Sequence, residues 1–125
     1  MTHTARLSLV ALALAVVGCG GSQVHAQVGT ITSGPSITAL NQAFDRSELV
    51  VTAGQATGVL FDNRDSVPHN IAIYAEAGEG QPLFQGEIFG GPASREYELP
   101  AFPAGTYLFR CDVHQDMKGT LVAKP

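Results

Sequence analysis

From residue 36 onward, apolar residues occur in short runs or alternate with polar ones, and Gly, Pro, Asn or Asp interrupts the runs. Short alternating segments between turn residues are typical of β-strands. We expect strands within residues 48–52, 57–61, 69–74, 87–89, 95–99, 105–111 and 119–123. No stretch has the period of an amphipathic helix, although residues 39–44 have room for one helical turn. Seven to eight strands in about 90 residues predict an all-β fold, an antiparallel Greek-key sandwich over residues 36–125.

The alternation also predicts where the side chains of two strands point. Tyr107, Phe109 and Cys111 share one face of their strand, so the thiol follows two aromatic residues inward. His69 begins another strand, and Pro68 before it suits a loop that delivers the imidazole. Strand ends and short loops meet at the ends of a sandwich, where functional sites are commonly built. We therefore expect His69 and Cys111 to converge at one end.

The first part of the chain has the order of an export signal. A short segment with one positive charge, Arg6, precedes an apolar stretch over residues 7–17, and small residues follow. The apolar stretch has 11 residues, whereas a membrane-spanning helix needs about 20. We predict an export signal over residues 1–18 and a protein that works in the bacterial periplasm or on the outer face of a membrane.

Two ways of removing the signal are open. The sequence Val16-Val17-Gly18-Cys19 resembles a bacterial lipobox, in which Cys19 is lipidated and becomes the new N-terminus. Residues 19–35, rich in Gly, Ser, Thr and Gln, would then be a flexible linker to a lipid anchor. The alternative is cleavage after Ala26 at a small-x-small pattern. Where the linker is retained, we expect its residue His25 to be solvated.

Charge and cysteine content narrow the classes of function. The 125-residue chain has a net charge of −4, which becomes −5 when the leader with Arg6 is removed. This excess of acidic residues argues against nucleic acid as a partner. Cysteines usually pair in exported proteins, yet we expect Cys111 to have no partner, because Cys19 is either lipidated or removed with the leader. Such a cysteine is a buried inert thiol, a reactive thiol or a metal ligand.

The neighbours of Cys111 favour a metal site. Cys111, His114 and Met117 are each separated by two residues, so a tight loop can bring three donors to one ion. His69, forty-two residues before Cys111, is the only other histidine outside the leader and linker. A thiolate, two imidazoles and a thioether accept both Cu(I) and Cu(II), which indicates a mononuclear blue-copper site with one copper per chain. Zinc is the main alternative ion, but a thioether is a poor zinc ligand.

These residues give the chain a resemblance to the cupredoxins, the family of small type 1 blue-copper proteins, from about residue 44 to residue 125. The matching segments are Val67-Pro68-His69-Asn70-Ile71 and residues 103–119. The compact Cys-x-x-His-x-x-Met loop is most similar to that of amicyanins, whereas plastocyanins and pseudoazurins have a longer gap before the methionine.

The resemblance assigns a role to each candidate residue. It implies that His69, Cys111 and His114 are equatorial copper ligands and that Met117 is the axial ligand. It also implies that Asn70 ties the two ligand loops together and that its backbone amide donates toward the Cys111 sulfur. Contacts of this kind tune the reduction potential of a metal.

The expected function is that of a one-electron carrier and not of an enzyme. The sequence has no His-x-His pair for a trinuclear copper cluster and no second cysteine in the loop for a binuclear one. A copper storage or delivery protein is the alternative. Many relatives place Pro and an apolar residue after the loop histidine, but here Gln115 and Asp116 follow. Asp112 and Asp116 suggest an acidic rim, and so a redox partner protein with a basic docking surface. Nothing in the sequence demands more than a monomer.

Overall fold

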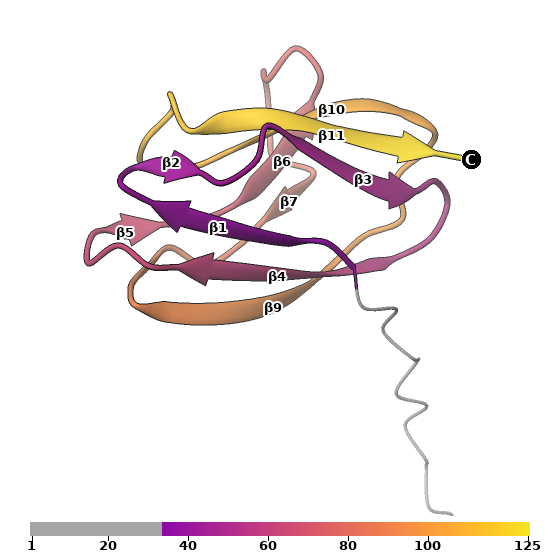
Figure 1. Ribbon diagram of the computed structural model, residues 1–125. Helices are drawn as coiled ribbons and strands as arrows, with labels where there is room; N and C mark the ends of the chain where they lie inside the picture. Colours follow the sequence, from indigo (N-terminus) through magenta and orange to yellow (C-terminus); the bar gives the residue numbers. More distant parts are fainter. Residues whose placement is uncertain (1–33) are drawn as a thin grey trace, which may run out of the picture.

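The computed structural model describes residues 34–125, so the predicted leader, Cys19 and almost all of the predicted linker lie outside the described residues (Figure 1). The described part consists of strands and loops. The strands are β1 (Ser36–Leu40), β2 (Ala43–Phe44), β3 (Glu48–Thr52), β4 (Thr57–Asn63), β5 (Pro68–His69), β6 (Ala72–Ala75), β7 (Phe84–Gln85), β8 (Phe89–Gly90), β9 (Ala93–Leu99), β10 (Gly105–Arg110) and β11 (Lys118–Lys124). Over residues 34–125 no helix has the length and apolar character needed to cross a membrane.

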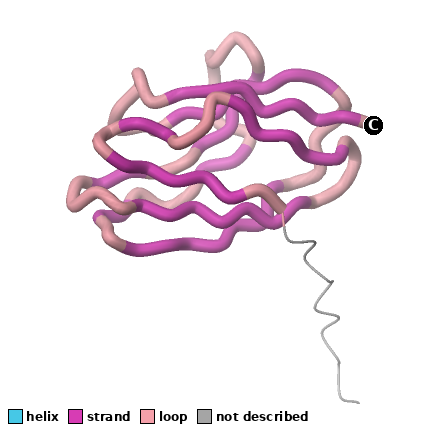
Figure 2. The backbone as a smooth tube through the Cα atoms, in the orientation of Figure 1, coloured by secondary structure: helices cyan, strands magenta, loops and turns pink. Residues whose placement is uncertain are grey.

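The strands form two layers and a small extra ladder (Figures 1 and 2). One sheet has the order β2-β1-β4-β9, the other has the order β3-β11-β10-β6-β7, and β5 pairs with β8. The predicted all-β sandwich is confirmed. Most pairs are antiparallel, but β1 with β4 and β3 with β11 are parallel. A parallel pair needs a crossover between its strands, and here the chain passes through the opposite sheet on the way, through β3 between β1 and β4 and through β4 and β9 between β3 and β11.

Alternating side chains of the two sheets fill the space between the layers. Leu49 and Val51 of β3 are buried, while their neighbours along the strand are exposed. Phe61 of β4 and Phe109 of β10 are fully buried, and the ring of Phe44 lies 6.4 Å from the first and 5.4 Å from the second, centre to centre. Burial of such a side chain contributes about 1.5–3 kcal/mol. These aromatic residues join the two layers near the centre of the core.

The structure corrects the expectation of a helical turn within residues 39–44. This segment is the β1–β2 hairpin, with Leu40 paired to Ala43. Its two central residues, Asn41 and Gln42, have φ values of 54° and 55°. A two-residue hairpin turn of type I′ requires positive φ at both central positions, and asparagine adopts that conformation more readily than most residues. The apolar pattern alone could not separate this turn from one turn of helix.

The single strand expected within residues 69–74 is divided in the structure. His69 ends β5 and pairs with Phe89, whereas β6 begins at Ala72 and pairs with β10. Between them, the backbone carbonyl of Ile71 accepts a hydrogen bond from the Gly86 amide at 2.9 Å. The chain therefore leaves the small ladder after His69, and two residues, Asn70 and Ile71, connect it to the large sheet at Ala72.

The small ladder, the end of β4 and the β10–β11 loop lie at one end of the sandwich, on the left in Figure 1, and the C-terminus lies at the other end. Two segments far apart in sequence, residues 63–70 and 111–117, thus meet at the same end.

Candidate metal centre

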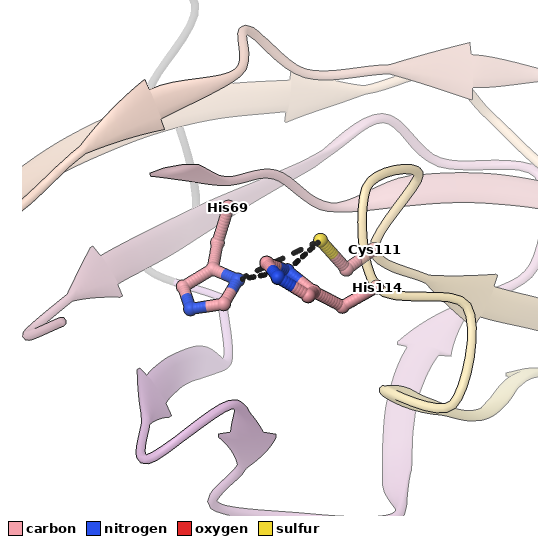
Figure 3. A group of neighbouring side chains, drawn as sticks. All are labelled: His69, Cys111 and His114. Carbon is pink, nitrogen blue, oxygen red and sulfur yellow. Dashed lines mark hydrogen bonds between the residues drawn. The ribbon is translucent and has the colours of Figure 1, made fainter. Parts of the chain in front are cut away.

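Three of the predicted ligand side chains converge at this end of the sandwich (Figure 3). The sulfur of Cys111 lies 3.7 Å from His69 Nδ1 and 3.9 Å from His114 Nδ1, and the two Nδ1 atoms are 3.1 Å apart. His69 comes from the end of β5, Cys111 directly follows β10, and His114 belongs to the β10–β11 loop. The fold therefore brings together donors that are forty-two residues apart in the sequence.

The size of this triangle suits a small metal ion. A point equidistant from the three donor atoms lies about 2.1 Å from each of them, and metal–nitrogen and metal–sulfur bonds at protein sites are about 2.0–2.3 Å. All three atoms are ligand types that copper accepts, and the thiolate favours Cu(I) while the imidazoles also suit Cu(II). The residues therefore fit a trigonal copper site in size and in chemistry.

The three donors differ in their access to solvent. His69 and Cys111 are fully buried, whereas His114 is half-buried. Val113, the residue before His114, has 49% of its surface exposed. The loop histidine is thus the donor nearest to solvent, and the other two are enclosed by the core.

Met117 closes the loop that carries two of these donors. Its carbonyl accepts a hydrogen bond from the Cys111 amide, and its amide donates to the His114 carbonyl, both at 2.9 Å. The Met117 side chain is buried in the same hydrophobic cluster as Cys111. The compact spacing in the sequence therefore corresponds to a compact, hydrogen-bonded loop. The role of Met117 as an axial ligand stays a prediction.

A carboxylate that the sequence reasoning missed holds the second nitrogen of His69. His69 Nε2 lies 2.8 Å from Asp65 Oδ2. The same carboxylate accepts hydrogen bonds from the backbone amides of Asn41 and Gln42, at 2.8 and 2.9 Å. The amide of Gln42 is the largest cause of a pKa of Asp65 below its ordinary value, and Asn41 and His69 lower it further. The sequence does contain a sign of this role, because Asp65 lies in the short loop just before the predicted ligand His69.

Asn63 organises that loop from inside the protein, and sequence reasoning also missed it. Its side chain is fully buried. Its amide nitrogen donates to the carbonyls of Val67 and Phe89, at 3.1 and 2.8 Å, and its oxygen accepts from the Asp65 amide at 2.9 Å. Gly91 packs against the same turn and donates its amide to the Asp65 carbonyl. Buried polar groups are costly unless they are paired, and here each hydrogen bond fixes part of the loop that carries His69.

Asn70 lies between the two loops, as its predicted linking role requires. Its side-chain oxygen accepts a hydrogen bond from the Asp112 amide at 2.8 Å, and its side-chain nitrogen donates to Asp112 Oδ2 at 2.9 Å and to the Gly86 carbonyl at 3.1 Å. The approach of its backbone amide to the Cys111 sulfur stays a prediction.

The acidic rim expected from Asp112 and Asp116 needs correction. Asp116 is exposed, but the side chain of Asp112 has only 15% of its surface exposed, because hydrogen-bond donors from neighbouring strands surround its carboxylate. Asp112 therefore belongs to the interior of the site and not to its outer surface.

Comparison with known proteins agrees with this geometry. The family model described as a cupredoxin-like domain matches residues 8–123. Auracyanin-A from Chloroflexus aurantiacus is 29% identical over 154 aligned residues, which cover 98% of this chain and 95% of the relative. The solved structure of auracyanin A, described as a "blue" copper protein of that bacterium, matches with a TM-score of 0.62 and 26% identity over 73% of this chain and 100% of its own. Amicyanin from Paracoccus versutus shares the fold, with a TM-score of 0.57 and 22% identity over 74% of this chain and 83% of its own.

Proposed function

The chain belongs to the cupredoxin-like domain family, and from this membership we propose that it is a mononuclear blue-copper protein that carries one electron at a time. The observation that supports this most directly is the triangle of His69 Nδ1, Cys111 Sγ and His114 Nδ1, with its two buried donors and one half-buried donor. A carrier of this kind transforms no substrate, so the protein is not an enzyme.

In this proposal His69, Cys111 and His114 would hold the copper ion, and Met117 would add its thioether as a fourth, weaker ligand. Copper bound by such a set would supply one-electron chemistry, because these ligand types accept both Cu(II) and Cu(I).

The surrounding residues keep the ligands in place. Asp65 holds the far nitrogen of His69, and Asn70 joins the His69 segment to the residue after Cys111. Buried hydrogen bonds of this kind fix the orientation of metal-binding side chains. These contacts leave the donor atoms free and restrain the ring and the loop that carry them.

His114 offers the route by which electrons enter and leave. Its ring is half-buried, and the exposed Val113 and Asp116 flank it in the same loop. We propose that a redox partner protein docks here, with basic residues that complement the net charge of −5 outside the leader. We also propose that the protein works as a monomer.

We further propose that residues 1–18 are an export signal and that the protein works in the periplasm or on the outer face of a membrane, with Cys19 as the point of lipid attachment. Mass spectrometry of the native protein tests this. A lipid adduct on Cys19 supports an anchored form, whereas an N-terminus at Gln27 shows ordinary cleavage and removes the anchor.

Visible absorption and EPR spectra of the exported protein, titrated with Cu(II), test the proposed function. We expect an intense blue charge-transfer band with narrow copper hyperfine splitting, reversible on reduction. Cys111→Ser should abolish the band and Met117→Gln should change the EPR parameters, whereas Gln115→Ala, an exposed change in the same loop, should leave the spectrum unchanged.

Two other outcomes would contradict the proposal. A colourless protein, or a pale one with ordinary tetragonal copper, would exclude a blue-copper carrier. A blue protein whose copper cannot be reduced and reoxidised reversibly would support copper storage or delivery instead.

A further inference from the structure

Asp112 directly follows the candidate ligand Cys111 in the chain. Hydrogen-bond donors from other side chains surround its carboxylate. The hydroxyl of Tyr74 donates to Asp112 Oδ1 at 2.6 Å. The side-chain amides of Asn70 and Gln85 donate to Asp112 Oδ2 at 2.9 and 2.7 Å. Three side chains from three different segments therefore converge on one acidic group.

The donors hold the carboxylate ionised in a sheltered position. Only 15% of the Asp112 side chain is exposed, and both of its carboxylate oxygens accept hydrogen bonds from neighbouring side chains, which stabilise the charged form. Tyr74 is almost fully buried, with 4% of its surface exposed. Because solvent screens such a position poorly, a charge there acts over a longer distance than a charge on the surface.

The carboxylate is also fixed in direction. Asn70 accepts from the backbone amide of Asp112 and donates to its side chain, so one residue holds both parts of Asp112. On the other side, Arg110 Nε lies 3.8 Å from Asp112 Oδ1, and the Arg110 guanidinium lies 4.0 Å from the centre of the Tyr74 ring. These contacts hold the carboxylate on several sides.

We propose that Asp112 is a positioning residue with an electrostatic role, a fixed negative charge beside Cys111 that lowers the reduction potential of the centre. The inference rests on the proposed function, because it concerns copper held by Cys111 and its partners. A nearby negative charge stabilises the more positive oxidation state, here Cu(II), relative to Cu(I). Removing the charge should therefore raise the potential.

The principal experiment compares Asp112→Asn with Asp116→Asn in the copper-loaded exported protein. Both variants lose one negative charge from the same loop, but only Asp112 is sheltered. We expect Asp112→Asn to raise the reduction potential clearly and Asp116→Asn to raise it less. Each tenfold rise in the affinity for Cu(I) relative to Cu(II) corresponds to 59 mV. The shift of Asp112→Asn should persist at high salt, because added ions screen buried charges less than exposed ones.

A second pair of variants distinguishes an electrostatic role of Asp112 from a purely structural one. Tyr74→Phe keeps the Asp112 charge but removes the hydroxyl that stabilises it, so the centre should experience a more negative field and its potential should fall. Tyr107→Phe is the matched control, because its hydroxyl donates to the carbonyl of Pro103 and not to Asp112. If Asp112 only holds the loop in shape, Asp112→Asn and Tyr74→Phe should instead shift the potential in the same direction.

The outcomes are distinguishable. A potential that rises in Asp112→Asn and falls in Tyr74→Phe supports the inference. An unchanged or lowered potential in Asp112→Asn, an equal effect of Asp116→Asn, or a rise in Tyr74→Phe overturns it and leaves the blue-copper function intact. Absence of a blue band in the unaltered protein overturns the proposed function itself, and the inference with it.

Discussion

His69 Nε2 lies 2.8 Å from the Asp65 carboxylate, on the side of the ring away from Cys111 and His114. With Nε2–H donating to Asp65, the Nδ1 lone pair of His69 is free to face the candidate metal centre. Two backbone amides in the turn between β1 and β2 donate hydrogen bonds to the Asp65 carboxylate. A hairpin more than twenty residues away in the sequence therefore helps to orient this ligand.

Asp65→Ala should weaken copper binding. Loss of the carboxylate leaves His69 free to change its tautomer and orientation, and removal of such a supporting residue typically lowers metal affinity about 10–100-fold. Competition titration with a copper chelator measures the change. Asp45→Ala is the control, because Asp45 also accepts a backbone hydrogen bond, from Thr38, but contacts no candidate ligand. Equal affinities of the two variants would contradict the role assigned to Asp65.

Asn63→Ala should destabilise the metal-free protein by about 2–4 kcal/mol, because it leaves two carbonyls and one amide of the His69 loop without their buried partner. Urea unfolding followed by tyrosine fluorescence gives the free energy of unfolding. Gln115→Ala, an exposed change, should alter it by less than about 0.5 kcal/mol. A stability of Asn63→Ala equal to that of the control would show that water replaces the lost hydrogen bonds.

Gly91→Ala should be far more damaging than the same change at the preceding residue. A Cβ atom on Gly91 would clash with the backbone carbonyl oxygens of Asn63 and Asp65. Both neighbours are backbone atoms, so the loop before His69 would have to move, at a cost of about 1–3 kcal/mol or more. In Gly90→Ala the nearest atom would be 3.2 Å away. Thermal unfolding of the two variants compares them, and equal melting temperatures would contradict the close approach.

Asp62 should make part of the stability depend on pH. Hydrogen bonds from Arg64 first, and then from Ser94, lower the pKa of Asp62 below the ordinary value. A carboxyl group with a lowered folded-state pKa stabilises the protein above its unfolded pKa of about 3.9, and this contribution disappears as the pH falls through the folded value. Asp62→Asn should therefore be less stable than the unaltered protein at pH 7, and the difference should vanish in strong acid.

Urea unfolding of the metal-free protein at a series of pH values tests the prediction for Asp62. Glu98→Gln, which replaces an exposed side chain on the same sheet, is the control. A stability difference between Asp62→Asn and the unaltered protein that stayed constant from neutral to strongly acidic pH would exclude the assigned titration.

Electron exchange with a cationic redox complex should slow as salt is added. Without the predicted leader the chain carries a net charge of −5, and attraction between unlike charges is screened beyond about 10 Å at 0.1 M ionic strength. Stopped-flow measurement of the second-order rate constant gives the dependence. An anionic complex of similar potential should show the opposite trend. A rate constant that does not depend on ionic strength would contradict the proposal that the partner has a basic docking surface.

Much of the fold followed from local patterns. The strand expected within residues 48–52 has the same bounds as β3, and the strands at 95–99, 105–111 and 119–123 correspond to β9, β10 and β11 with shifts of at most two residues at their ends. These segments have clear alternation and sharp turn residues. The two-residue strands β5 and β7 carry no such pattern, and they exist because partners elsewhere in the chain pair with them.

The candidate site, too, could be predicted from the sequence only in part. The scarcity of soft donors outside the leader left Cys111, His114, Met117 and His69 as the one set that could bind copper, and softness is a property of residue type. Asp65, Asn63 and the interior position of Asp112 could not be predicted, because an aspartate or asparagine in a loop is usually solvated.

The sequence by itself therefore determined the all-β class, the candidate donors and the net charge, since each depends on residue identity and short-range order. Only the tertiary structure decided which donors converge, which carboxylates are buried, and which strands run parallel. Hydrogen bonds such as Asp65 to Gln42, Asn63 to Phe89 and Asp112 to Tyr74 join residues that are distant along the chain. Such contacts form only when segments distant in sequence have come together in the fold, and no local pattern specifies them.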